Sequence, residues 1–504
     1  MMASATAATL VGVQGHVVQV EVHLSNGLPS FTIVGLPDAA CREARDRVRA
    51  ALLSSALEWP QSRVTVNLAP SGLRKGGSAL DLAIAAAVLA ATEQIPLAAL
   101  EGRAFLGELG LDGSVRPAPG ILPLTDAVAE CEVVVAPDAY HLALAASPRG
   151  VKSVARLDQM TRAFTGLAGW PDPPPAPPPP PAPVVPDLDE VSGQPQARRA
   201  VEIAAAGAHH LLMMGPPGAG KTMLARRLVG LLPELPHGYA LEATRIQSAA
   251  GMPLPAGLAT RPVLRHPHHT STMTALVGGG SGSVRPGEVS LAHRGVLFLD
   301  ELGEFAPTAL EALRQPLEEG LIRISRASGY CEFPARFLLV AAMNPCPCGE
   351  AGRPGRCRCP DSARRRYARR LSGPLLDRFD LRVMVQRPSA DALLDPGRGE
   401  TTAAVGARVV EARKRAAARG VEANVELSGT DLDKVSSLTP AAQRLLRDRL
   451  EDGTLSGRGL HRVRTVALTI ADLAGDEPLL TEEQLASALS LRADTRMLLG
   501  SVVS

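Results

Sequence analysis

The pattern of apolar and polar residues divides the first third of this 504-residue chain into short strands and alanine-rich helices. Apolar runs of strand length are HVVQVEVHL (16–24), SRVTVNLA (62–69) and EVVVAP (132–137), and helical stretches such as SALDLAIAAAVLAAT (78–92) lie between them. This alternation is typical of α/β domains. The pattern predicts an α/β domain over residues 1–170.

The middle of the chain has longer continuous apolar runs. LLMMG (211–215), GVLFLDE (295–301) and RFLLVAAMNP (336–345) are separated by helical stretches. Continuous apolar strands are buried on both faces, as in a parallel sheet covered by helices. We therefore expect an αβα core with a parallel sheet over residues 187–388, followed over residues 389–504 by a charged, helical lid domain with no strong strand.

Residues 171–186, PDPPPAPPPPPAPVVP, form the sharpest boundary. Proline excludes helix and ladder hydrogen bonds and favours a stiff, extended chain. The stretch is interpreted as a tether between two bodies. A proline motif that binds a partner is the alternative interpretation.

Charge and cysteine usage limit the class of protein. The 53 basic and 51 acidic residues give a net charge of +2, so contact with nucleic acid or membrane would need a local patch. The sequence has no run of about 18 apolar residues and no secretory signal, which predicts a cytoplasmic protein without a membrane partner. Seven cysteines, an odd number, favour reduced thiols over a disulfide framework.

The segment GPPGAGKT (215–222) has the spacing of a phosphate-binding loop between an apolar strand and a helix. Its glycines let backbone N–H groups surround the phosphates of ATP, its lysine reaches the outer phosphates, and its threonine hydroxyl ligates Mg²⁺. The cofactor-binding residues predicted here are Gly215, Gly218, Gly220, Lys221 and Thr222.

Carboxylates and other polar side chains complete a predicted hydrolysis site. Asp300 and Glu301 end the strand GVLFLDE, where the first can hold Mg²⁺ and the second can polarise the attacking water. Asn344 ends a further strand and can bind the γ-phosphate or the water. Arg378, in LLDRFD, can supply positive charge to a neighbouring subunit's transition state. The alternative for Arg378 is a salt bridge with Asp377 or Asp380.

These residues, with the phrase LVGGGSGSVRPGEVSLAHRGVLFLDELGEF (276–305), resemble an AAA+ ATPase of the magnesium-chelatase-like group. The resemblance implies a homo-oligomeric ring, usually a hexamer, with ATP between subunits. It makes Asn344 the first sensor, Arg378 the arginine finger and Arg458 the second sensor, with Arg462 as a competing choice. It also implies pore-lining hairpins near residues 268–288 and 324–333.

The first domain contains KGGSALDLAIAAAVL and GELGLDGSVRPAPGILPLTDA, which resemble the proteolytic domain of Lon proteases, with Ser78 at the nucleophile. The lysine of the Lon dyad falls at Leu122, and no lysine occurs from residue 76 to residue 150. A serine hydroxyl needs an adjacent base to attack an amide. We therefore predict a Lon-like fold without peptidase activity, in which Ser78 is a structural residue at a helix start.

A Lon-like domain joined to this AAA+ core resembles the YifB/ComM family of bacterial ATPases over nearly the whole chain. That resemblance implies a helicase that acts on single-stranded or branched DNA and promotes branch migration in recombination or natural transformation. Two alternatives stay open: the ATPase subunit of a magnesium or cobalt chelatase, and an ATP-dependent Lon-like protease.

Four cysteines, Cys346, Cys348, Cys357 and Cys359, form two C-x-C pairs eight residues apart. Four thiolates in a reducing compartment suit Zn²⁺, although the one-residue spacing is shorter than usual. Free thiols at a loop and a redox switch are the alternatives.

Two further stretches are rich in basic or imidazole side chains. ARRRYARRLSG (363–373) either grips phosphates while Tyr367 stacks on a base, or forms an exposed helix between subunits. His266, His268 and His269 are interpreted as structural, because no acidic or cysteine ligand lies close to them in sequence.

Overall fold

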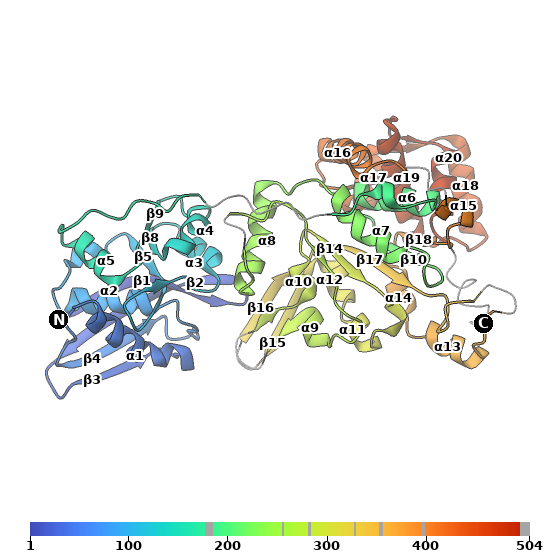
Figure 1. The fold of residues 1–504 in the computed structure, drawn as a ribbon. Coiled ribbons are helices and arrows are strands. Elements are labelled where there is room, and N and C mark those ends of the chain that lie inside the picture. Colours follow the sequence, from blue (N-terminus) through green and yellow to red (C-terminus); the bar gives the residue numbers. More distant parts are fainter. Residues whose placement is uncertain are drawn as a thin grey trace.

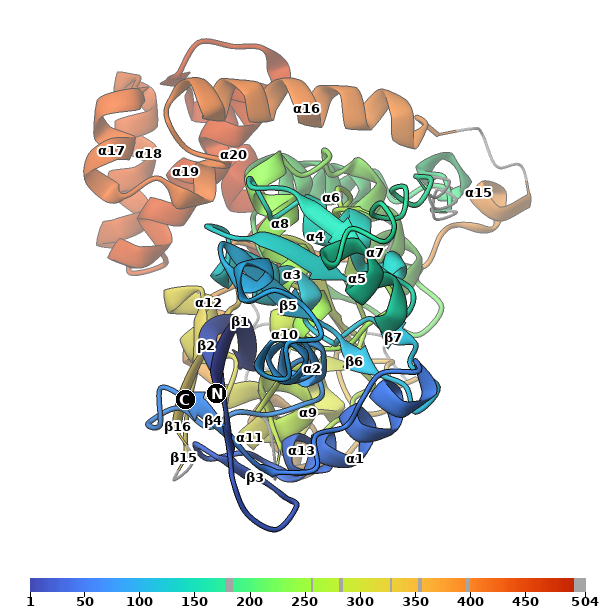
Figure 2. The same ribbon diagram turned by 90° about the vertical axis from the view of Figure 1, so that its left-hand side faces the viewer.

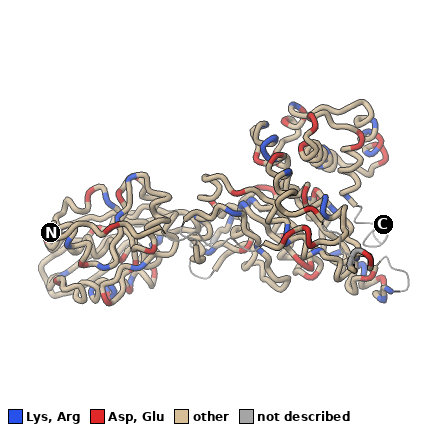
Figure 3. Tube along the Cα trace, turned by 45° about the horizontal axis from the view of Figure 1, so that its top comes forward, with Lys and Arg blue, Asp and Glu red and all other residues tan. Residues whose placement is uncertain are grey.

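The structure is a computed structural model that describes residues 1–176, 185–254, 257–280, 284–326, 329–351, 356–394 and 399–493. Figure 1 shows three groups of elements in chain order: an α/β unit, a second α/β unit, and a cluster of helices above it. Lys and Arg are interspersed with Asp and Glu along all three groups, as the near-zero net charge predicts (Figure 3). In the described residues, the structure has no helix long and apolar enough to cross a membrane.

The N-terminal unit is built on a mixed sheet of seven strands. In spatial order they are β3 (Ser30–Val34), β4 (Arg63–Ala69), β2 (Gln14–Ser25), β1 (Met2–Val11), β5 (Arg103–Leu106), β8 (Glu132–Val135) and β9 (Val151–Ser153). β1 pairs antiparallel with β2 and parallel with β5. The predicted strands at 16–24, 62–69 and 132–137 correspond to β2, β4 and β8.

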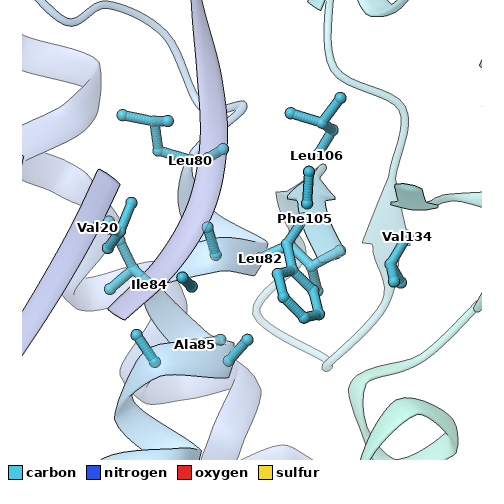
Figure 4. Packing of buried hydrophobic residues seen from close by; sticks show 14 of the residues in the cluster. Val20, Leu80, Leu82, Ile84, Ala85, Phe105, Leu106 and Val134 are labelled. Atoms are coloured by element: carbon cyan, nitrogen blue, oxygen red, sulfur yellow. The ribbon is translucent and has the colours of Figure 1, made fainter. Parts of the chain in front are cut away.

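Helix α2 (Asp81–Ala91) lies at the centre of this unit and is buried on every side. Its residues Leu82, Ile84 and Ala85 pack among side chains of β2, β5 and β8 (Figure 4). Burying a leucine or isoleucine side chain contributes about 1.5–3 kcal/mol. Because α2 is buried on every side, its sequence is a continuous run of apolar residues after Asp81.

The second unit has a parallel sheet of five strands, as expected for the core. Their spatial order is β11 (Leu264–Arg265), β14 (Val296–Leu299), β17 (Leu338–Met343), β10 (Leu211–Met214) and β18 (Leu381–Met384). β14, β17 and β10 are buried along their whole length. The helices on either face include α6 (Pro195–Gly207), α7 (Lys221–Leu228), α8 (His237–Ala249) and α12 (Arg314–Glu319).

The chain ends in a cluster of helices, in which α16 lies across the top of the molecule in Figure 2. The main helices are α16 (Thr402–Ala418), α17 (Gly429–Val435), α18 (Pro440–Glu451), α19 (Gly457–Ala474) and α20 (Glu482–Ser490). A serine or threonine hydroxyl at the N-cap of each of these five accepts a hydrogen bond from a backbone N–H of the first turn. Each such cap stabilises a helix by about 1 kcal/mol.

The N-terminal unit is docked on the core through α3 (Ile121–Ala127) and α8. The Leu122 N–H donates to Ser248 Oγ at 3.4 Å, and the Gly120 N–H donates to the Ser248 carbonyl at 3.1 Å. Arg245 on α8 pairs with Asp126 at 2.6 Å. Figure 1 shows α8 standing between the two sheets.

A second contact lies between the β1–β2 turn and the hairpin β15 (Leu321–Arg326) and β16 (Gly329–Pro334). Val13, in that turn, belongs to the same buried cluster as Cys331 and Phe333 of β16. This hairpin matches the position near residues 324–333 where the sequence resemblance placed one. In the proline-rich stretch, residues 171–176 have no helix or strand, and residues 177–184 lie outside the described residues.

Candidate functional site

The predicted site residues follow the carboxyl ends of three neighbouring strands. The phosphate loop follows β10, Asp300 and Glu301 follow β14, and Asn344 follows β17. Because parallel strands end at the same edge of a sheet, the topology brings these segments together.

The glycines of the loop have structural roles that other residues would not fill. A Cβ on Gly215 would lie 2.0 Å from the Val385 carbonyl oxygen, so the loop passes too close to the end of β18 for a side chain. Gly218 and Gly220 have φ angles of +74° and +86°, which favour glycine. Helix α7 begins at Lys221, directly after the loop, so its N-terminal N–H groups face the site.

Lys221 is buried and lies at the centre of the loop. Its Nζ donates to the Gly215 carbonyl at 2.7 Å, to the Pro216 carbonyl at 3.0 Å and to Asn344 Oδ1 at 3.1 Å. Burial lowers the pKa of Lys221, while Asp300 and Glu301 raise it in part. The contact with Asn344 joins the two residues that the sequence assigned to the outer phosphates.

Thr222 and Asp300 form the predicted magnesium pair. The Thr222 hydroxyl donates to Asp300 Oδ2 at 2.6 Å, so two hard oxygen ligands lie side by side. Mg²⁺ prefers such ligands, together with phosphate oxygens and water. The donor set therefore fits Mg²⁺.

Glu301 has a left-handed backbone, with φ +53° and ψ +46°. Its N–H donates to Asp300 Oδ1 at 2.9 Å, and its side chain is 54% exposed. This conformation is costly for a residue other than glycine and occurs often at functional sites. The two carboxylates have different partners: Asp300 accepts from the Thr222 hydroxyl, whereas Glu301 contacts His269.

His269 contacts Glu301, and the sequence interpretation of this histidine as merely structural missed the contact. His269 Nδ1 lies 3.0 Å from Glu301 Oε2. The other two histidines have structural partners: His266 stacks on Phe298, and His268 Nδ1 bonds the Thr270 hydroxyl at 2.8 Å. The sequence offered no signal for this contact, because 31 residues lie between His269 and Glu301 in the chain.

Replacing His269 by alanine is expected to lower kcat of ATP hydrolysis by about tenfold, the effect of losing one polar contact of about 1.4 kcal/mol. KM for ATP should stay near the wild-type value, because His269 contacts Glu301 and not the phosphate loop. His269→Asn keeps a donor near the Nδ1 position and should restore most of kcat. Steady-state kinetics of the two variants test this, and an unchanged kcat in His269→Ala contradicts it.

Arg378 is buried and pairs with Glu318 on α12, not with Asp377 or Asp380. Burial lowers the pKa of this guanidinium, and the neighbouring charges of Arg462, Arg458 and Arg314 lower it further. The arginine therefore lies within a cluster of cations, where an added anion is favoured.

The two candidates for the second sensor lie in different environments. Arg458 is exposed in the first turn of α19. Arg462 is engaged, because its Nη1 donates to Asp380 Oδ1 and to the Arg378 carbonyl, both at 2.6 Å. This difference favours Arg458 as the residue available to a nucleotide.

The four clustered cysteines bring their sulfurs together, all within 4.8 Å of one another. The Sγ atom of Cys346 lies 3.4 Å from that of Cys348 and 3.8 Å from that of Cys357. The Sγ atoms of Cys348 and Cys357 are 3.7 Å apart. Four sulfurs at about 2.3 Å from a tetrahedral Zn²⁺ would be about 3.8 Å apart. The cluster can therefore hold a metal ion. Residues 352–355, between the two pairs, lie outside the described residues.

The basic stretch after the cysteines forms α13 (Asp361–Ala368). Tyr367 is buried against Gly303, so the proposal that it stacks on a base is wrong. Burial raises the pKa of Tyr367 to about 12. Arg370 donates to the Gly303 carbonyl at 2.7 Å and pairs with Glu304 at 2.9 Å. The helix thus supports the turn that follows Glu301.

Ser78 in the N-terminal unit does not cap α2, since the N-cap is Leu80 without a side-chain bond. Its hydroxyl donates to the Glu108 carboxylate. Lys75, three residues before Ser78, is buried and donates to the Pro70 carbonyl. Leu122, at the position of the Lon lysine, is buried in α3.

The parallel sheet, the phosphate loop and the carboxylate pair define a P-loop ATPase. Comparison with family profiles narrows this class: residues 187–393 match "Magnesium chelatase, subunit ChlI", residues 20–139 match "Subunit ChlI of Mg-chelatase" and residues 399–492 match "Magnesium chelatase, subunit ChlI C-terminal". The chain thus has the fold expected of a magnesium-chelatase-like AAA+ ATPase.

Full-length relatives give the family. An uncharacterised protein of Mycobacterium tuberculosis is 48% identical over 497 residues, 95% of this chain and 96% of the relative. The competence protein ComM of Haemophilus influenzae is 41% identical over 97% of both chains, and YifB of Escherichia coli is 41% identical over 97% of this chain and 96% of its own. The chain belongs to the YifB/ComM family of AAA+ ATPases, which confirms the resemblance predicted from sequence.

Partial matches are informative about the separate domains. The magnesium-chelatase 38 kDa subunit of Cereibacter sphaeroides is 27% identical over 217 residues, 39% of this chain and 58% of that protein. Lon protease 2 of Bacillus subtilis is 28% identical over 145 residues, 27% of this chain and 26% of that protein. The N-terminal unit is accordingly Lon-like, and the middle unit is chelatase-like.

Proposed function

We propose that this protein is an ATP-driven ring motor that acts on DNA, a helicase that promotes branch migration. The observation that carries the proposal is the likeness to the competence protein ComM along nearly the entire chain, Lon-like unit included. The chelatase subunit, by contrast, is similar over 39% of this chain. The proposed pathway is homologous recombination or natural transformation.

The site supports hydrolysis of ATP with Mg²⁺. The loop N–H groups and Lys221 would bind the phosphates, Thr222 and Asp300 would hold Mg²⁺, and that ion would neutralise charge on the phosphate oxygens. Glu301 would accept a proton from the attacking water, and Asn344, bonded to Lys221, would position the γ-phosphate.

Arg378 and Arg458 favour assembly of several copies. Arg378 contacts Glu318 in its own chain, and Arg458 is exposed beside it at the start of α19. In the proposed ring, most simply a hexamer, these arginines would face the ATP of a neighbouring subunit and stabilise charge in the transition state. The ring would place the β15–β16 hairpin of each subunit toward the DNA.

The cysteine cluster would hold Zn²⁺ as a structural cofactor. Its sulfur spacing suits a tetrahedral ion, and four soft ligands select zinc over magnesium. The proposal of Zn²⁺ rests on the sulfur spacing and does not depend on whether the substrate is DNA.

The test is ATP hydrolysis by the wild type without nucleic acid and with single-stranded DNA, duplex DNA or a four-way junction, at several salt concentrations. Stimulation by single strands or junctions that weakens as salt rises is expected, because phosphate contacts release counterions. Glu301→Gln serves as the inactive control. Hydrolysis that is indifferent to every DNA would reject the DNA motor and favour the chelatase-type alternative.

A further inference from the structure

The cysteine cluster lies against the phosphate loop itself. Gly349, one residue after Cys348, has φ +78° and donates its N–H to the Cys346 carbonyl at 2.9 Å. A Cβ on Gly349 would lie 2.3 Å from Pro217 Cδ, so the turn of the first cysteine pair is packed against the middle of the loop.

Arg387 joins the same two segments by hydrogen bonds. Its Nε donates to the Pro217 carbonyl at 3.1 Å, and its Nη2 pairs with Glu350 at 2.9 Å. Glu350 follows Gly349 directly, so the arginine links the cysteine turn to the loop through a second path.

The chain on both sides of the cysteines also reaches the site. Asn344, two residues before Cys346, bonds Lys221 at 3.1 Å. After Cys359 the chain enters α13, whose Tyr367 packs on Gly303 behind the Glu301 turn. The described residues on the two sides of the cluster, 344–351 and 356–370, therefore contact the loop, its lysine and the turn after Glu301.

We propose that a Zn²⁺ ion bound by Cys346, Cys348, Cys357 and Cys359 fixes the position of the phosphate loop, so that nucleotide affinity depends on metal occupancy. The ion would join the two cysteine pairs and hold the turn at Gly349 against Pro217. Without the ion, thiol contacts alone would join the two cysteine pairs, and Arg387 would be left as the polar link between the turn and the loop. The inference deepens the proposed ATPase function and rests on its nucleotide site, not on DNA.

The experiment uses the full-length protein and measures zinc per chain by elemental analysis and the Kd of a fluorescent ATP analogue at fixed excess Mg²⁺. We expect about one zinc per chain. A zinc-selective chelator should raise Kd by about tenfold, equivalent to 1.4 kcal/mol, and added Zn²⁺ should restore it. The double variant Cys357→Ser/Cys359→Ser should behave like the chelated protein, whereas Cys131→Ser, a cysteine of the N-terminal unit, should not.

Arg387→Ala separates the link from the metal, since it leaves all four sulfurs in place. Arg387→Ala should keep its zinc and still bind the analogue more weakly than the wild type. This variant keeps the proposal testable if the cysteine variant does not fold. Zinc below about a tenth of an equivalent in reduced protein, or equal Kd with and without zinc, would overturn the proposal. Because no DNA is present, failure of DNA to stimulate hydrolysis would leave this result unaffected.

Discussion

Replacing Glu301 by glutamine is expected to lower kcat of ATP hydrolysis by about 10²–10⁴-fold, the usual contribution of a general base. The amide has nearly the same shape as the carboxylate but cannot accept the proton of the attacking water. ATP binding should persist, because the loop, Lys221 and the Thr222–Asp300 pair are intact. Glu301→Gln should therefore bind ATP with near wild-type Kd and retain it unhydrolysed.

Glu304 provides the matched control for this prediction. It lies three residues further along the same turn, is exposed and pairs with Arg370 at 2.9 Å. Glu304→Gln removes the same charge from the same turn, and we expect a change in kcat of at most a few-fold, as for an exposed ion pair. Equal losses in the two variants would show that the charge of the turn, and not the Glu301 carboxylate, matters.

Replacing Asp380 by alanine is expected to lower the free energy of unfolding by about 3–5 kcal/mol, the cost of breaking a buried ion pair from one side. Asp380 is 2% exposed and bonds Arg462 of α19 at 2.6 Å and the His210 N–H at 2.9 Å. Asp380 thus connects helix α19 of the lid to the backbone directly before strand β10 of the core. Burial alone would raise the pKa of Asp380. Arg462, His209 and His210 nevertheless hold this pKa below its ordinary value.

Urea unfolding of Asp380→Ala and Asp377→Ala measures this cost. Asp377 is a suitable control because its side chain is 63% exposed and lies 3.7 Å from Arg382. Its loss should cost no more than about 1 kcal/mol. A similar change in both variants would contradict the role given to Asp380.

The sequence was sufficient for the parts of the site whose chemistry is local. The phosphate loop, the Asp300–Glu301 pair and Asn344 each follow a recognisable apolar strand, and the parallel sheet brings them together. Strand β1 was not predicted, because MASATAATLV is rich in alanine and lacks large β-branched residues in its first half. Its pairing with β2 along its full length, and the close packing of α2, outweigh that weak propensity.

Contacts between segments far apart in the chain could not be predicted from the sequence. The pairing of His269 with Glu301, the burial of Tyr367 and the partner of Arg378 each depend on how separate elements pack. For Arg378 the sequence offered the nearby Asp377 and Asp380, whereas the fold supplies Glu318 from α12, which precedes strands β15, β16 and β17 in the chain. Proximity along the chain was therefore a poor guide to charge pairing here.

Helix α3 ties the residue at the expected Lon lysine position to the contact between the N-terminal unit and the core. Its Leu122 occupies the place of the catalytic lysine in the Lon resemblance, is fully buried, and offers its N–H to Ser248 of the ATPase core. A lysine in place of Leu122 would bury a charge at this contact, at a cost of several kcal/mol. The chain could therefore gain a lysine here only by loosening the attachment of its first unit to its second.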